Sequence, residues 1–175
     1  MTKIRRHDTL VPAPATGLRG RATRRGELLS EFLGFELAGE RFGLPLSSIR
    51  EILTYSEATE VPGAQPHVLG ILAVRGVMTT VLDLRRRLRM PSVATTKSSR
   101  ILLVDGGQDE SIGLLVDRVF QVHRLKEDEL ELAATVAGDL SEYVYGIGRP
   151  GDSERGQTSH DDIMILLDPG PLLRK

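Results

Sequence analysis

The stretch HVLGILAVRGVMTTVLDLRRRL, residues 67–88, decides the fold of this chain. Its apolar residues alternate loosely, and the pair Arg75-Gly76 divides it into two short runs. Gly76 can adopt the positive φ that a tight reversal needs, while Arg75 can point outward from the turn. The stretch is therefore predicted to form a β-hairpin, which breaks at the cationic run Arg85–Arg87.

Short β-strands are predicted on both sides of this hairpin, because apolar runs alternate there with turn residues. Strands are expected over 32–37, 42–46, 100–104 and 112–116, with a loop over 61–66 and a polar linker over 91–99. Pro45 suggests that the second strand lies at a sheet edge or a bulge. Residues 47–53 fit either one helical turn or the start of another strand.

The two halves of the chain resemble each other. Five positions of the first half match five of the second half at a constant offset: Gly43, Leu44, Leu46, Ile49 and Ile52 correspond to Gly113, Leu114, Val116, Val119 and Val122. Later in each half, Val81-Leu82-Asp83 corresponds to Leu166-Leu167-Asp168. A repeated set of about five short strands suggests two small β-barrels, because closing each sheet removes its exposed edges. We therefore predict an all-β fold with two barrels.

The composition limits the classes of protein to consider. The chain has 175 residues and no cysteine, which excludes disulfides and thiolate metal sites and fits a reducing compartment. No apolar run approaches the roughly 18 residues of a membrane span, and no apolar signal region is present at the start. We therefore expect a soluble, cytoplasmic protein.

Basic charge is concentrated at the start of the sequence. Residues 1–29 hold seven Lys or Arg against Asp8 and Glu27, so the remaining residues carry 16 basic and 22 acidic side chains. Few large apolar residues are present in this segment to offset the entropy of ordering it. We predict a disordered basic tail over residues 1–30 and one domain over residues 31–175. Such a tail could touch nucleic acid or an anionic membrane, or could be only a solvated extension.

Several motifs together carry a family resemblance. They are G-x-x-x-V-R-G-V-x-x-x-V-L-D-L-R at 70–85, I-R-E-I at 49–52, V-P at 61–62 and G-L-L-V-D-R-V at 113–119. With this combination, residues 31–173 resemble the CheW family of chemotaxis coupling proteins. The resemblance implies two intertwined SH3-like five-stranded barrels with short helical turns. It also implies a non-enzymatic adaptor without cofactors, which bridges chemoreceptor tips and the regulatory domain of a CheA-like histidine kinase.

The same resemblance implies receptor-binding positions, which are Ile49, Glu51, Gly70, Val74 and Arg75. Core packing and turn geometry would explain Ile49 and Gly70 equally well. Glu51 and Arg75 are better candidates, because a charge at a turn or strand end has little reason to be buried. Kinase-binding residues are not assigned, although the family suggests apolar positions on the other barrel.

The sequence also departs from the family pattern. Ala73-Val74-Arg75-Gly76 stands where the family usually has Asn-Leu-Arg-Gly, Thr80 replaces a usual proline, and the loop 149–162 is longer and more polar than usual. The polar side chain that the family usually has beside this arginine is absent here, which would alter the receptor-facing surface. These departures affect the identity of the partners more than the fold.

Enzymatic readings are not favoured. Residues 146–151 match G-x-G-x-x-G, but the following segment is polar and no helix is expected after it. His160, Asp161 and Asp162 point in different directions if the chain is extended, so no metal site is predicted. The carboxylates of Asp83, Asp117 and Asp168 lie near strand ends, where capping of backbone N–H groups is their usual role.

Two other functions remain open. The first is a nucleic-acid-binding barrel protein that uses the basic tail with Arg85–Arg87 and Arg89, and it predicts strongly salt-dependent binding. The second is a CheW-like protein that keeps only one of the two partner surfaces.

Overall fold

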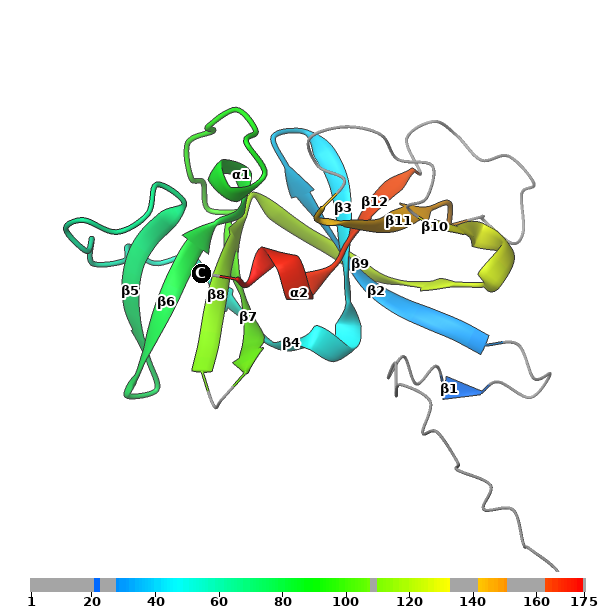
Figure 1. Cartoon of the computed structure of the whole chain (residues 1–175), viewed down its shortest axis with the longest axis horizontal. Coiled ribbons are helices and arrows are strands. Elements are labelled where there is room, and N and C mark those ends of the chain that lie inside the picture. The colour runs from blue at the N-terminus through cyan, green and yellow to red at the C-terminus, as the bar shows by residue number, and fades with distance from the viewer. Residues whose placement is uncertain (1–20, 23–27, 108–109, 133–141, 151–162, 175) are drawn as a thin grey trace, which may run out of the picture.

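The computed structural model describes residues 21–22, 28–107, 110–132, 142–150 and 163–174. Within these ranges the chain forms short strands and very few helical turns, arranged as two β-barrels side by side (Figure 1). The strands are β1 (Arg21–Ala22), β2 (Leu28–Leu37), β3 (Glu40–Pro45), β4 (Ile49–Thr54), β5 (Val68–Val74), β6 (Val77–Asp83), β7 (Arg100–Gly107), β8 (Glu110–Val116), β9 (Arg118–Leu125), β10 (Leu130–Leu132), β11 (Val144–Gly148) and β12 (Met164–Leu167). The helical turns are η1 (Leu46–Ser48), α1 (Leu84–Arg87), η2 (Glu127–Glu129) and α2 (Pro169–Leu172).

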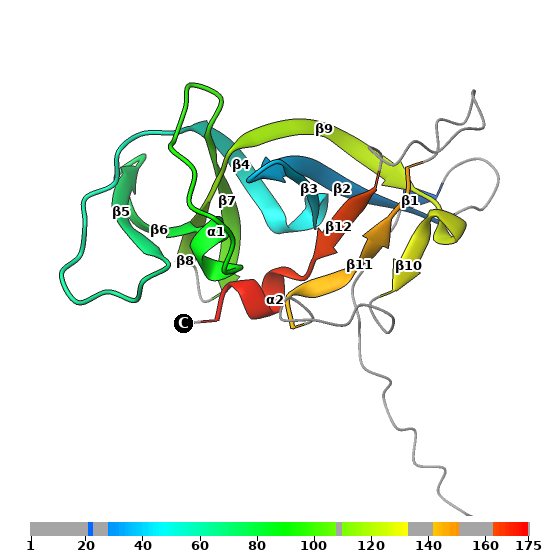
Figure 2. The ribbon, with the colours of Figure 1, turned by 90° about the horizontal axis from the view of Figure 1, so that it is seen from above.

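Each barrel takes strands from both halves of the sequence. Barrel 1 has the order β1-β2-β3-β12-β11-β10, with β9 also paired to β2. Barrel 2 has the order β4-β7-β8-β6-β5. In Figure 2 the strands of barrel 1 curve around a common centre, and β9 runs across from barrel 2 to reach β2. The all-β, two-barrel prediction is therefore confirmed, and the two barrels are intertwined.

The internal repeat has a glycine at an equivalent position in each half of the chain. Gly43 in β3 pairs in parallel with Leu166 in β12, and Gly113 in β8 pairs in parallel with Val81 in β6. A Cβ atom at Gly43 would lie 2.9 Å from a methyl group of Leu166, and one at Gly113 would lie 2.7 Å from Ile101. Both halves therefore use a glycine where two strands run in parallel and side chains crowd the space between them.

The largest buried cluster contains residues from both barrels. Phe35, Phe42 and Leu44 of barrel 1 pack there with Leu82, Leu102 and Leu114 of barrel 2. Two smaller clusters lie within single barrels, one around Phe32 and Leu166 and the other around Val81 and Ile101. Because the largest apolar core is shared, the two barrels form one packed unit.

Most of the strands predicted from the sequence are present, with one wrong inference about Pro45. β3 is an inner strand between β2 and β12, not an edge strand. Pro45 is its last residue, and β12 pairs only with Phe42 and Gly43, so the missing N–H group of the proline interrupts no pairing with β12. Residues 47–53 contain both alternatives, because the turn η1 is followed directly by the strand β4.

The first sheet begins earlier than the domain boundary predicted at residue 31. β2 starts at Leu28, and its first two residues pair with Arg21 and Ala22 of β1. The rest of the predicted tail, most of the loop 149–162 and the residues His160–Asp162 lie outside the described residues. Among the described residues, no helix is long and apolar enough to cross a membrane.

Candidate partner-binding surfaces

The central hairpin forms as the sequence predicts, with Val74 of β5 paired to Val77 of β6. Gly76 has a φ of 83°, as expected, but Arg75 also has a positive φ, of 50°. Two consecutive residues in the left-handed region are typical of a type I′ turn, whose twist matches that of the flanking strands. The turn thus projects the side chain of Arg75, which is 78% exposed, from the tip of the hairpin.

Arg75 forms an ion pair with Glu51, another predicted site residue. Nη2 of Arg75 lies 2.6 Å from Oε1 of Glu51. Glu51 belongs to β4 and Arg75 follows β5, and these strands are the two edges of the barrel 2 sheet. The structure therefore brings the two charged candidates together across the seam where barrel 2 closes.

Gly70 has a structural reason to be glycine. It is buried, it has a φ of 154°, and a Cβ atom there would collide with the carbonyl group of Thr59. The close approach lets Thr59 exchange two backbone hydrogen bonds with Ile71, of 2.9 and 2.8 Å. Gly146 has the same position in barrel 1, where a Cβ atom would lie 2.5 Å from the carbonyl oxygen of Glu131.

The other two candidates are partly buried. Ile49 packs against the core that the two barrels share, and Val74 packs against the core of barrel 2. Of the five predicted positions, Glu51 and Arg75 therefore present charged groups at the surface, whereas Ile49, Gly70 and Val74 hold the surface in place.

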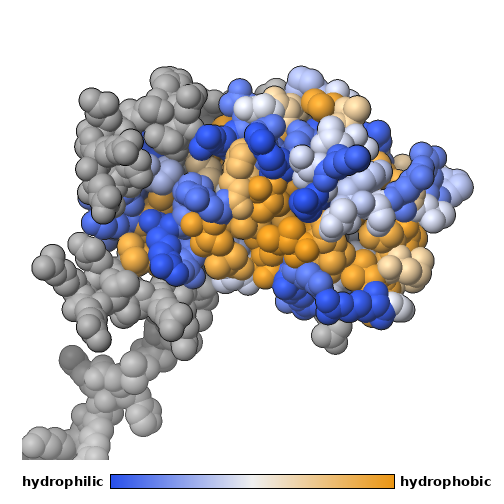
Figure 3. Space-filling model, turned by 180° about the vertical axis from the view of Figure 1, so that it is seen from behind, coloured by the Kyte–Doolittle hydropathy of each residue, from blue (hydrophilic) through white to orange (hydrophobic). Residues whose placement is uncertain are grey.

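Exposed apolar side chains next to Arg75 were missed by the sequence reasoning. Val77 is 58% exposed and Met78 is 67% exposed, and both begin β6 directly after the turn. Their signal in the sequence is two consecutive apolar residues after a turn glycine, where an alternating strand would have one polar residue. Figure 3 shows hydrophobic residues gathered on the rear face, across the middle of the molecule and toward barrel 2.

Arg85 is buried, which corrects its inclusion with Arg86 and Arg87 in the nucleic-acid-binding alternative. Its side chain is 2% exposed and lies between two carboxylates. Nε is 3.0 Å from Oδ1 of Asp83, and Nη1 is 2.8 Å from Oδ1 of Asp117 and also donates to the carbonyl oxygen of Val93. The other oxygen of Asp117 accepts the backbone N–H group of Ala38, at 2.6 Å. This network ties barrel 2, the linker and the β2–β3 turn together.

The predicted capping role of the aspartates is confirmed. Asp83 accepts the backbone N–H group of Arg85 at the start of α1, and Asp168 accepts that of Gly170 at the start of α2. These equivalent caps end β6 and β12, the last strands of the two sequence repeats.

Arg87 ties α1 to the C-terminal helix. Its Nη2 atom donates to the carbonyl oxygens of Pro171 and Arg174, and its guanidinium group lies 5.6 Å from the centre of the Tyr143 ring. Nη1 lies 3.2 Å from Nε2 of His67. Burial, followed by the nearby charge of Arg87, lowers the pKa of His67 below 6.5. Two of the three consecutive arginines therefore serve the fold.

Chemistry at a metal centre finds no support in the part of the chain that the structure describes. Within it, no three His, Asp or Glu side chains converge closely enough to hold a metal ion. The best-defined candidate surface among the described residues is the tip of the β5–β6 hairpin, where the Arg75–Glu51 pair lies near the exposed side chains of Val77 and Met78.

Comparison with known proteins identifies the same fold. A family model described as the CheW-like domain matches residues 31–175. The chemotaxis protein CheW of Bacillus subtilis is 32% identical over 99 residues, which are 57% of this chain and 63% of that protein. The chemotaxis protein CheW of Klebsiella aerogenes is 28% identical over 144 residues, which are 82% of this chain and 81% of that protein.

A solved structure extends the likeness to three dimensions. The scaffolding protein TtCheW from Thermoanaerobacter tengcongensis matches with a TM-score of 0.70 and 26% identity, over 82% of this chain and 92% of that one. The family match covers both barrels from within β2 to α2 and includes the hairpin with Arg75 and the Asp83–Arg85 motif. The chain therefore belongs to the CheW family.

Proposed function

We propose that this protein is a cytoplasmic adaptor that couples chemoreceptors to a CheA-like histidine kinase within receptor arrays. The observation that carries the proposal is the match of the complete two-barrel domain to the CheW-like family. This family consists of non-enzymatic scaffold proteins, so we look for binding surfaces and not for a reaction centre.

The receptor-facing surface is assigned to the tip of the β5–β6 hairpin. Arg75 there offers N–H donors that its contact with Glu51 leaves available, and Val77 and Met78 add apolar area beside the charge. An apolar patch next to a directed cation is a common form of protein recognition site. A receptor helix with a carboxylate beside apolar residues would fit it.

The kinase regulatory domain is assigned to barrel 1, following the family pattern. Exposed apolar side chains are present on that barrel as well, because Val122 of β9 is 40% exposed and Leu132 of β10 is 58% exposed. Two separate surfaces on one packed unit would let both partners bind at the same time.

The adaptor acts by linkage and performs no chemistry. Because the barrels share one core, a receptor on barrel 2 and a kinase on barrel 1 would be held in a fixed relative orientation. A ligand-driven change in the receptor then alters the kinase equilibrium, since the conformations of the two partners are coupled.

Separate purified fragments test the proposal. The receptor tip and the kinase regulatory domain would each be titrated into the full chain by calorimetry, alone and together, at about 0.15 M ionic strength. We expect both to bind and to form a ternary complex. Binding of only one fragment would indicate an adaptor with a single surface. Loss of both, with strongly salt-dependent binding of a DNA oligonucleotide, would favour the nucleic-acid alternative.

A further inference from the structure

A second exposed cationic group lies on barrel 1, far from the hairpin tip. Glu36 of β2 is directly opposite Arg118 of β9 and also directly opposite Arg41 of β3. Directly paired residues share one face of a sheet, so Arg118, Glu36 and Arg41 form a cross-strand row. In Figure 1 the β2–β3 turn beside this row is at the top, whereas the β5–β6 turn is at the bottom.

The charges of this row are not balanced. Nη2 of Arg118 lies 2.9 Å from Oε2 of Glu36, but Arg41 makes no ion pair with any residue that the structure describes. Both guanidinium groups lie over the ring of Phe120, at 5.2 Å for Arg41 and 5.1 Å for Arg118. The ring holds two arginines at the surface, where one of them has its charge uncompensated.

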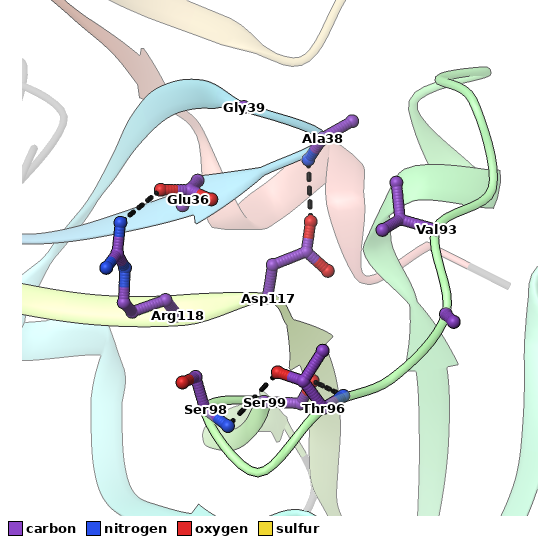
Figure 4. A pocket seen from close by; sticks show the side chains of 10 residues that line it. Glu36, Ala38, Gly39, Val93, Thr96, Ser98, Ser99, Asp117 and Arg118 are labelled. Carbon is purple, nitrogen blue, oxygen red and sulfur yellow. Dashed lines mark hydrogen bonds and ion pairs between the residues drawn. The ribbon is translucent and has the colours of Figure 1, made fainter.

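A pocket of about 330 Å³ adjoins the row, and Glu36 and Arg118 form part of its rim. Its other walls come from the β2–β3 turn, the linker before β7 and Asp117. Figure 4 shows the linker residues Thr96, Ser98 and Ser99 facing Glu36 and Arg118 across the opening. Val93, on the linker wall, is 43% exposed, so the pocket has an apolar side open to solvent.

The walls of this pocket are fixed before any ligand enters. Asp117 is held by Ala38 and Arg85. Across the opening, the N–H group of Thr96 donates to Oγ of Ser99 at 2.9 Å, and the N–H group of Ser98 donates to Oγ1 of Thr96 at 3.1 Å. A pocket that needs no ordering loses less entropy when it binds a ligand.

We infer that the Arg118–Glu36–Arg41 row and its adjoining pocket bind an extended segment of a protein partner, with a carboxylate on the arginines and a small neutral side chain in the pocket. Arg41 supplies the unpaired charge that favours a carboxylate. The pocket favours a neutral group, because Glu36 and Asp117 line it together with hydroxyl and methyl groups. This surface lies on barrel 1, as does the proposed kinase surface, but the inference is argued from the row and the pocket alone and does not depend on that proposal.

The chemistry of the row disfavours a nucleic acid. The carboxylates of Glu36 and Asp117 would repel a chain of phosphates. No residue of the row or of the pocket lining is aromatic, and the neighbouring ring of Phe120 is already covered by two guanidinium groups. A base would therefore find no open stacking surface here.

Selection from a random peptide library displayed on phage tests the inference. The library would be panned on the full chain after counter-selection on the double variant Arg41→Gln, Arg118→Gln, which removes peptides that bind elsewhere. We expect the enriched peptides to carry Asp or Glu next to a small neutral residue. A synthetic copy should bind the double variant at least about tenfold more weakly, as measured by fluorescence anisotropy.

Two further variants separate charge from pocket. Ala94→Trp fills the pocket opening without a change of charge and should also weaken the selected peptide. Arg50→Gln removes an exposed arginine of barrel 2, paired with Asp105, and should leave binding unchanged. Circular dichroism checks the fold of each variant. The inference is wrong if no peptide distinguishes the wild type from the double variant, if acidic residues are not enriched, or if a single-stranded DNA oligonucleotide binds the row more tightly.

Discussion

Arg75 carries its charge at the tip of a hairpin, where a substitution changes a surface more than a fold. Arg75→Glu places a second carboxylate beside Glu51 and reverses the charge of the proposed receptor-binding surface. An exposed ion pair contributes about 0–1 kcal/mol, so the free energy of unfolding should change by no more than that. Affinity for a receptor-tip fragment, measured by calorimetry, should fall by about tenfold or more.

The matched control for Arg75 is Arg50→Glu, a reversal at another exposed arginine of barrel 2. This control should leave receptor affinity near the wild-type value, and both variants should still bind the kinase fragment. Receptor affinity that is unchanged in Arg75→Glu would contradict the assignment of the hairpin tip.

Arg85 is expected to behave in the opposite way, because its charge is buried between Asp83 and Asp117. Arg85→Met keeps much of the volume but removes the cation of Asp117 and leaves Asp83 only the more distant Arg86, at 3.6 Å. Removing one partner from a buried ionic network costs about 3–5 kcal/mol. Urea unfolding should show this loss, whereas Arg86→Met, at the half-exposed neighbouring residue, should cost less than about 1 kcal/mol. Equal losses in the two variants would mean that the network contributes little.

The three arginines also show where residue-level prediction stops. Arg85, Arg86 and Arg87 are the same residue type in sequence, and their run predicts only a cationic end to an apolar strand. The fold separates them, because Asp117, which holds Arg85, lies between β8 and β9 and follows Arg85 by 32 residues in the chain. Only the capping role of Asp83 could be predicted from neighbouring residues, because its side chain accepts the backbone N–H group of Arg85, two positions further along the chain.

At the scale of elements, each barrel has a glycine that lets a neighbouring segment approach closely, Thr59 at Gly70 of β5 and β10 at Gly146 of β11. Gly70→Ala adds a Cβ atom against the carbonyl group of Thr59 at a positive φ. We expect a loss of about 3 kcal/mol in unfolding free energy from strain and steric overlap together. Thermal or urea unfolding measures it.

Gly63 supplies the matched control for Gly70. It has a φ of 78°, but a Cβ atom there would have no neighbour within 4 Å. Gly63→Ala should therefore cost only the backbone strain, about 1 kcal/mol. If both variants lose the same stability, the close approach to Thr59 is not what requires glycine at residue 70.

Elements that depend on neighbouring residues were predicted well, and those that depend on distant ones were not. The hairpin follows from the Arg75-Gly76 turn, because turn and strands are contiguous in the sequence. The position of β3 does not, since Pro45 argues for an edge while the choice of β12 as a neighbour is made by packing across the chain. The exchange of strands between barrels came from the family resemblance, because alternation within a strand does not specify its partner.

At the scale of the whole molecule, stability should depend on pH through His67. Burial and Arg87 lower the pKa of His67 from 6.5, so the unfolded chain binds the proton more tightly than the folded one. The corresponding stability is present above pH 6.5 and is lost as the pH falls from 6.5 through the lowered value. Urea unfolding at a series of pH values should show this loss in the wild type.

His67→Gln isolates that contribution, because the carboxylates common to both proteins cancel in the difference. Below pH 6.5 the wild type should lose unfolding free energy relative to the variant. Any stability advantage of the wild type should therefore become smaller or pass to the variant. A difference that does not change with pH would show that His67 keeps an ordinary pKa in the folded protein.

The strand exchange also sets an order in which the molecule can assemble during synthesis. All strands of barrel 2, β4 to β8, precede β9 to β12 in the sequence and therefore leave the ribosome before them. Barrel 1 contains both β2 and β12, so its first hairpin waits for nearly the whole chain before its neighbours exist. Until then, β2 and β3 can pair only with each other and with β1 among the strands of barrel 1. Barrel 2 is thus the part of the nascent chain able to close first, and barrel 1 is completed only when β12 becomes available.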